Sequence, residues 1–222
     1  MIRNLKSTRR AAASGKATSL MVFLHGYGAD GDDLMGLASQ MATYFPDTVF
    51  VAPDAPQTCA GNAAGFQWFS VPQVDGASEE DAVEGMMQSA KDLDAYLDQV
   101  IEQEGVSADK CVVFGFSQGT MMALQVAPRR KDALCAVVGF SGSLMLPDAL
   151  RDEVVTRPPV MLLHGDKDEV VPPEALSKAE FALDTLGFEV YAFVMENAAH
   201  GIAGDGLSVA SGFLREKLGI ED

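Results

Sequence analysis

The sequence predicts an α/β protein in which helices cover both faces of one mostly parallel, twisted sheet. Short apolar runs alternate with longer amphipathic segments, and the runs are continuously apolar, as expected of strands covered on both faces. Strand, helix and strand in succession favour parallel pairing with right-handed crossovers. The 222 residues, 48% of them hydrophobic, suit one domain over residues 1–222 that buries a sizeable core.

Each element is predicted from its own pattern. Strands are expected at residues 19–24, 48–52, 110–114, 134–140, 160–164 and 189–194. Helices are expected at residues 33–44, 80–104, 118–128, 172–187 and 205–218, the fourth beginning at Pro172 and Pro173. Residues 3–9 are a candidate antiparallel edge strand. Residues 53–79 fit neither pattern, because they are rich in Gly, Ala and Pro, and a loop this long is usually functional or mobile.

Charge and cysteine content restrict the function classes. The formal net charge of −16 repels nucleic acid and anionic lipid headgroups. No window of about 18 apolar residues predicts a membrane span, and the basic, alanine-rich start lacks the uninterrupted apolar core of a signal peptide. The three unclustered cysteines argue against a disulfide framework. We therefore expect a cytoplasmic protein with neither nucleic acid nor an integral membrane association.

Two similar five-residue sequences each contain a serine that is a candidate nucleophile. Residues 115–119 read GFSQG and residues 139–143 read GFSGS, each after an apolar run. The first matches G-x-S-x-G, in which a serine occupies a sharp strand-to-helix turn between two small residues. The helix expected after it would direct N–H groups and a positive dipole at the reaction centre. Ser117 is therefore the candidate nucleophile.

Ser141 does not meet the same test. Position 143 is serine rather than glycine, and SLMLPDAL follows in place of a predicted helix. We interpret Ser141 as part of a turn at a strand end that lines the same cleft.

A nucleophilic serine needs a histidine base and an acid that orients it. In chain order the acid follows the serine and the histidine comes last, which selects His200 from the three histidines. The loop after residue 164 offers Asp166, Asp168 and Glu169. Asp168 is favoured because Asp166 sits in a tight turn where it would bond local backbone. Asp205 is a weaker rival, because it is expected to cap the final helix.

The oxyanion donors follow from the same template. One is the backbone N–H of Gln118, the residue after the nucleophile, and the other comes from the loop after an early strand. That loop reads HGYGAD over residues 25–30, and the N–H of Tyr27 is expected to point inward. His25 would then shape the loop.

Taken together, the stretches FLHGYGADGDDL, FGFSQGTMMAL, HGDKDEVVP and AAHGI resemble the phospholipase/carboxylesterase family of small serine esterases. The resemblance runs from about Leu20 to Leu218. It implies an α/β-hydrolase fold without a large cap domain, a catalytic triad of Ser117, Asp168 and His200, and oxyanion donors at Tyr27 and Gln118. Members of this family often form homodimers, so the resemblance leaves a homodimer open here.

Three positions depart from the family pattern. Tyr27 stands where leucine is usual and would narrow the cleft. Thr120 replaces a second glycine after S-Q-G, and Gly201 replaces a bulkier or polar residue after the histidine. The last two changes are expected to alter packing around the site without removing its chemistry.

The expected activity is hydrolysis of short- to medium-chain acyl esters through an acyl-enzyme, with no metal or cofactor. Trp68 and Phe69 are candidate walls of the acyl pocket, although Trp68 could equally anchor the long loop to the core. Acyl-protein thioesterase or lysophospholipase activity is the alternative within the family. A non-catalytic binding protein on the same fold and a peptidase with the same triad are alternatives of other classes.

Overall fold

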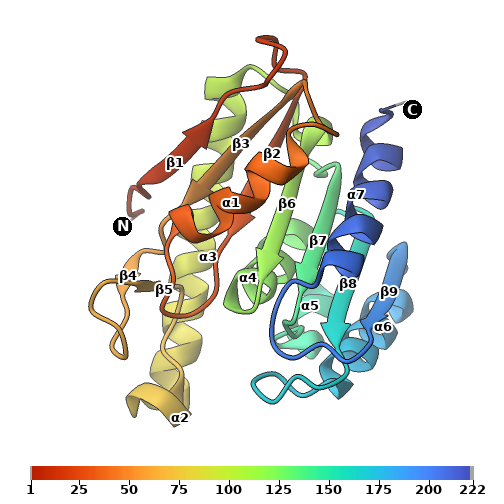
Figure 1. Cartoon of the computed structure of the whole chain (residues 1–222). Helices are drawn as coiled ribbons and strands as arrows, with labels where there is room; N and C mark the ends of the chain where they lie inside the picture. The colour runs from red at the N-terminus through yellow and green to blue at the C-terminus, as the bar shows by residue number, and fades with distance from the viewer. Residues whose placement is uncertain (1, 221–222) are drawn as a thin grey trace.

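The computed structural model describes residues 2–220, and in this part of the chain one seven-stranded sheet has the order β1-β3-β2-β6-β7-β8-β9. All neighbouring strands pair in parallel except β1, which runs antiparallel to β3 (Figure 1). The strands are β1 (Ser7–Arg10), β2 (Ser19–Leu24), β3 (Thr48–Pro53), β6 (Cys111–Phe116), β7 (Ala136–Phe140), β8 (Val160–Gly165) and β9 (Val190–Met195). The predicted mostly parallel sheet is therefore confirmed.

Helices cover both faces of this sheet (Figure 1). They are α1 (Gly31–Met41), α2 (Pro72–Asp75), α3 (Glu79–Glu104), α4 (Gln118–Val126), α5 (Pro147–Glu153), α6 (Glu174–Thr185) and α7 (Gly204–Leu218). Because side chains alternate along a strand, Met21 and Phe23 of β2 pack in a core with α1 and α7, whereas Leu20 and Val22 pack in a core with α3, α4 and α6.

Helix boundaries differ from the prediction by up to three residues, as in α1, which spans Gly31–Met41 where residues 33–44 were expected. Two of the differences concern predicted residues at helix starts. Helix α6 begins at Glu174, with Pro173 in the capping position and Pro172 outside the helix. Helix α7 begins at Gly204 after Ala203, so Asp205 lies in the first turn and is not the N-cap. In both cases the local residue preference was identified correctly but was placed one or two positions away from the boundary.

Two segments expected to be irregular contain short elements. Residues 53–79 hold a small hairpin of β4 (Gln57–Thr58) and β5 (Phe66–Gln67), followed by the one-turn helix α2. The segment between β7 and β8 holds the seven-residue helix α5, where no helix was expected. Since α5 is the one helix that the structure describes there, the expectation of no large cap agrees with the fold.

The parallel strands direct their carboxyl ends to the same edge of the sheet. The loops that leave this edge after β2, β6, β7, β8 and β9 carry Tyr27, Ser117, Ser141, Asp168 and His200, respectively. Ligands of open α/β sheets bind at this edge, so the fold gathers the candidate residues where a site is expected. No helix among residues 2–220 has both the length and the apolar character that crossing a membrane requires.

Candidate active site

Ser117 occupies a sharp turn between β6 and α4, with φ 53° and ψ −117°. A non-glycine residue adopts this backbone region only at an energetic cost, and such strain is concentrated at functional sites. The flanking glycines are required sterically. A Cβ atom on Gly119 would lie 1.9 Å from the carbonyl oxygen of Leu24, and one on Gly115 would lie 2.5 Å from the carbonyl carbon of Gly119. The turn thus has the geometry that the G-x-S-x-G spacing predicts.

His200 is hydrogen-bonded to a buried carboxylate. Its Nδ1 lies 2.8 Å from Oδ2 of Asp168, whose side chain is fully buried. Oδ1 of Asp168 accepts from the N–H groups of Val170 and Val171, each at 2.9 Å. Burial favours the neutral form of Asp168, but these hydrogen bonds, that from His200 foremost, outweigh it and hold its pKa below the ordinary value. The His200 ring lies 4.9 Å from the ring of Phe116, the residue before Ser117.

The other candidate acids, Asp166, Glu169 and Asp205, have surroundings that differ from those of Asp168. Asp166 and Glu169 are exposed. Asp205 accepts a hydrogen bond of 2.8 Å from the N–H of Gly206 at the start of α7. Among residues 2–220, no three His, Cys, Asp or Glu side chains are grouped as ligands of a metal ion would be.

The two other histidines have structural partners. Nε2 of His25 accepts from the N–H of Ala55 at 2.9 Å, and burial lowers the His25 pKa. Nε2 of His164 lies 2.9 Å from the carbonyl oxygen of Val171, so it carries the proton, and it also lies 3.3 Å from Oδ2 of Asp168. His164 thus supports the carboxylate that contacts His200, a role that was not predicted from the sequence.

The loop after β2 brings Tyr27 to the same place. Gly28 has φ 78°, which suits glycine, and its N–H donates to the carbonyl oxygen of Phe66 at 2.8 Å. Tyr27 lines a cavity together with Ser117 and Gln118. Its hydroxyl is buried without a hydrogen-bond partner among the described residues, and this burial raises the Tyr27 pKa to about 12.

This cavity has a volume of about 390 Å³ and a mainly apolar wall. Its apolar side chains come from the segment 69–74, from the start of α3, from α4 and from the loops after β7 and β8. They are Phe69, Val71, Pro72, Val74, Ala82, Val83, Met86, Met121, Met145, Val170 and Val171. Glu79 contributes the one carboxylate among the described lining residues. An apolar cavity that reaches a serine is suited to an acyl chain.

Two residues expected to contact substrate do not line this cavity. Trp68 is fully buried, and its Nε1–H donates to the carbonyl oxygen of His25 at 3.0 Å, so it anchors the long loop. Ser141 is also fully buried, with φ 48°, and its Oγ has no partner among residues 2–220. Phe69, the neighbour of Trp68, does line the cavity.

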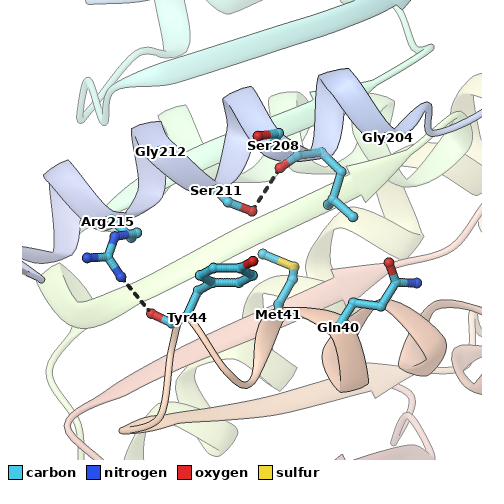
Figure 2. A pocket seen from close by; sticks show the side chains of 9 residues that line it. Gln40, Met41, Tyr44, Gly204, Ser208, Ser211, Gly212 and Arg215 are labelled. Atoms are coloured by element: carbon cyan, nitrogen blue, oxygen red, sulfur yellow. Dashed lines mark hydrogen bonds between the residues drawn. The ribbon is translucent and has the colours of Figure 1, made fainter. Parts of the chain in front are cut away.

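A larger cavity, of about 540 Å³, lies between α1 and α7 (Figure 2). Met41 and Tyr44 face small residues of α7 there, including Ser208 and Ser211. The hydroxyl of Ser211 donates to the carbonyl oxygen of Leu207 at 2.8 Å. The described lining holds neither a histidine nor a carboxylate, so volume alone does not identify the reactive site.

The second of the two similar sequences, GFSGS at residues 139–143, packs against the side chain of Thr120. A Cβ atom on Gly139 would lie 2.4 Å from Cγ2 of Thr120, and one on Gly142 would lie 2.4 Å from its Cβ. The hydroxyl of Thr120 donates to the carbonyl oxygen of Phe140 at 2.8 Å, and the N–H of Ser117 bonds the same oxygen at 2.9 Å. The two glycines therefore make room for the side chain that departs from the family pattern.

This packing predicts a stability effect that depends on residue 120. Gly139→Ala should destabilise the protein by about 1–3 kcal/mol through overpacking against Cγ2 of Thr120. Thr120→Ser removes that methyl group but keeps the hydroxyl, so Gly139→Ala should cost much less in the Thr120→Ser background. Urea unfolding of the wild type, both single variants and the double variant measures this coupling. Additive losses would contradict the steric explanation.

Comparison with known proteins decides the family. Residues 8–218 match the family model described as Phospholipase/Carboxylesterase. The chain belongs to this family. By that description, members of the phospholipase/carboxylesterase family cleave carboxylic esters, so the chain is a carboxylic-ester hydrolase with an α/β-hydrolase fold.

Individual members resemble the chain along most of its length. Esterase PE8 superposes with a TM-score of 0.93 and 40% identity, over 97% of this chain and 100% of that chain. Acyl-protein thioesterase 1 of Saccharomyces cerevisiae is 28% identical over 226 residues, which cover 96% of this chain and 99% of the yeast protein. Esterase YpfH of Escherichia coli is 27% identical over 199 residues, which cover 90% of this chain and 83% of that protein.

Proposed function

We propose that the chain is a serine carboxylesterase for short- to medium-chain acyl esters, with Ser117 as nucleophile, His200 as base and Asp168 as orienting acid. One observation carries the proposal. A histidine held by a buried carboxylate at 2.8 Å packs against the ring of Phe116, and the next residue, Ser117, occupies a strained strand-to-helix turn at the wall of an apolar cavity. This combination is the arrangement that activates a serine hydroxyl.

The reaction runs in two steps. Oγ of Ser117 attacks the acyl carbon while Nε2 of His200 takes its proton and then delivers that proton to the leaving alcohol. Because Asp168 accepts from Nδ1–H of His200, it fixes the tautomer that leaves Nε2 free to accept, and it stabilises the imidazolium. Water then attacks the acyl-enzyme, again with His200 as base, which releases the acid and restores Ser117.

The negative charge on the carbonyl oxygen is stabilised by two backbone donors. Gln118 is the first residue of α4, so its N–H has no partner within the helix and lies at the positive end of the helix dipole. The second donor is the N–H of Tyr27. Removal of one such donor typically lowers kcat by about 10²–10³-fold.

The cavity supports an apolar acyl group of limited size. Its volume of about 390 Å³ lies at the lower end of the range for ligand sites. Methionines Met86, Met121 and Met145 give the wall an adaptable surface, because their side chains are unbranched and polarizable. The alcohol portion of the substrate is less restricted, since the acyl-enzyme forms whichever group leaves.

Acyl-protein thioesterase activity is the second candidate, and the yeast relative of that name favours it. Lysophospholipase activity is a third, which the net charge of −16 disfavours at an anionic membrane surface. All three activities would proceed through an acyl-enzyme on the same serine, and they differ in the leaving group. We also propose a cytoplasmic location, because Cys59, Cys111 and Cys135 are free thiols. A homodimer stays a prediction from the family resemblance.

The size of the acyl pocket is tested with p-nitrophenyl esters of increasing acyl length. Val83 lines the cavity yet is 37% exposed, so Val83→Trp should fill the cavity without overpacking the core. We expect kcat/KM for the longer esters to fall about 10-fold or more relative to the acetate. Val155→Trp is the control, because Val155 is exposed and is not a lining residue of the cavity. Equal length profiles for the two variants would contradict the assignment of this cavity.

A phosphonate that labels nucleophilic serines tests whether the chain is catalytic at all. The adduct should be found by mass spectrometry on the peptide that contains Ser117. Absence of both an adduct and ester turnover would favour a binding protein on this fold.

A further inference from the structure

The segment 66–69 contacts both elements that carry the proposed oxyanion donors, the loop after β2 and the start of α4. Toward the loop after β2, the N–H of Gly28 donates to the carbonyl oxygen of Phe66 at 2.8 Å, and the N–H of Phe66 donates to the carbonyl oxygen of Ala29 at 2.7 Å. Toward α4, this segment forms two bonds with one side chain, that of Gln118. A single stretch of chain therefore touches the two sides of the reaction centre.

The side-chain amide of Gln118 uses both of its polar atoms on this segment. The N–H of Trp68 donates to Oε1 of Gln118 at 3.0 Å, and Nε2 of Gln118 donates to the carbonyl oxygen of Phe69 at 2.8 Å. Gln118 is 3% exposed, so water does not compete freely for either bond. A buried amide bonded at both ends holds its backbone partners in one geometry.

The indole of Trp68 continues the connection to the first loop. Its Nε1–H donates to the carbonyl oxygen of His25 at 3.0 Å, and its ring centroid lies 5.7 Å from that of His25. The hydroxyl of Ser89 donates to the carbonyl oxygen of Trp68, which anchors the 66–69 segment to α3. Hydrogen bonds thus run from Gln118 through Trp68 to the residue two positions before Tyr27.

We propose that the Gln118 side chain and Trp68 form a brace that sets the distance between the two oxyanion donors. This inference rests on the proposed function. Gln118 then has two separate roles: its backbone N–H binds the oxyanion, and its side chain is a positioning group for the loop that carries Tyr27.

The physical need for a brace follows from the sheet. One donor lies in the loop after β2 and the other in the first turn of α4, and loops are more mobile than helices and strands. Both N–H groups must lie within about 2.7–3.1 Å of one oxygen atom at the moment of reaction. Hydrogen bonds from the 66–69 segment to the loop after β2 and to α4 keep this geometry in place before substrate binds.

The test replaces Gln118 with methionine, which has similar volume and lacks the amide while the backbone N–H remains. Gln125→Met is the matched control. Gln125 lies two turns further along α4, is 1% exposed and bonds Sδ of Met87 at 3.2 Å, away from the 66–69 segment. We expect kcat/KM of Gln118→Met to fall about 10–100-fold, with Gln125→Met within about 3-fold of the wild type. Thermal unfolding shows the stability of both variants.

A transition-state analogue separates a positioning role from a structural one. The inhibition constant of a trifluoromethyl ketone, whose adduct carries an oxyanion, should rise in Gln118→Met by the factor that kcat/KM falls. Inhibition by the primary alcohol of the same chain length, which fills the cavity but carries no oxyanion, should change less than about 3-fold. Equal weakening of both ligands, or a kcat/KM equal to that of Gln125→Met, would overturn the brace.

A second variant covers the case in which Gln118→Met does not fold. Trp68→Phe keeps an aromatic ring in the core but removes the Nε1–H that donates to the carbonyl oxygen of His25. The same selective loss of ketone inhibition is expected, and its absence would overturn the brace. Failure of the proposed function is recognised separately, because the wild type would then show no esterase turnover.

Discussion

Ser117→Ala should lower kcat for ester hydrolysis by on the order of 10⁶-fold, since removal of the nucleophile of a triad costs about that much. A residual acceleration over water should persist from the oxyanion donors and from binding. The variant should fold, although alanine keeps the strained φ of 53°. Initial rates on the best p-nitrophenyl ester, with circular dichroism as a fold check, measure the effect.

Ser141→Ala is the matched control for this variant. Ser141 also has a positive φ, of 48°, and also follows Gly-Phe at the end of a strand. Its Oγ is buried without a partner among residues 2–220, so deletion of the hydroxyl should leave stability unchanged or raise it slightly. If Ser141→Ala lost as much activity as Ser117→Ala, or if Ser117→Ala matched the wild type, the assignment of the nucleophile would be wrong.

Asp168→Asn should lower kcat by about 10⁴-fold near neutral pH, because an amide facing Nδ1 can stabilise the wrong tautomer of His200 and cannot stabilise its cation. KM should change little, since Asp168 is fully buried and does not line the cavity. The control is Asp166→Asn, an exposed aspartate two residues earlier in the same loop, which should retain wild-type kcat. Equal activities of the two variants would exclude Asp168 as the acid.

The pH dependence of stability gives an independent check on Asp168. Its pKa in the folded protein lies below the ordinary value, because hydrogen bonds to His200 and the neighbouring N–H groups favour the charged form. The ionised carboxylate therefore stabilises the fold above the unfolded pKa of about 3.9, and this contribution is lost as pH falls through the folded pKa. The stability difference between wild type and Asp168→Asn should shrink over that acidic range. A difference that is constant with pH would contradict the lowered pKa.

The order and type of the main elements could be predicted because they depend on neighbouring residues. The predicted strand at 19–24 coincides with β2, and the predicted edge strand at 3–9 overlaps the antiparallel strand β1. Boundaries were missed at both ends of elements: α1 ends at Met41 where residue 44 was expected, and α6 and α7 begin at Glu174 and Gly204. A capping residue such as Asp205 has the same preference in the first turn as at the N-cap, so pattern alone does not choose between them.

The functions of side chains in long-range contacts were harder to predict. Trp68 fitted both a pocket wall and an anchor, and burial by residues of other elements made it an anchor. Ser141 was expected at the cleft but is fully buried. The double hydrogen bond of the Gln118 side chain links positions 50 and 49 residues apart in the chain, which no local pattern reports.

By itself, the sequence determined the α/β order and the strand-to-helix turn at Ser117, because each rests on residues within one element or one turn. It also narrowed the base to His200, by chain order among three histidines. Only the tertiary structure decided which acid contacts that histidine, since Asp168 and His200 lie 32 residues apart and meet through the pairing of β8 with β9. It likewise decided which aromatic side chain faces the cavity, because that depends on the direction each side chain takes once the segment is bonded to α4.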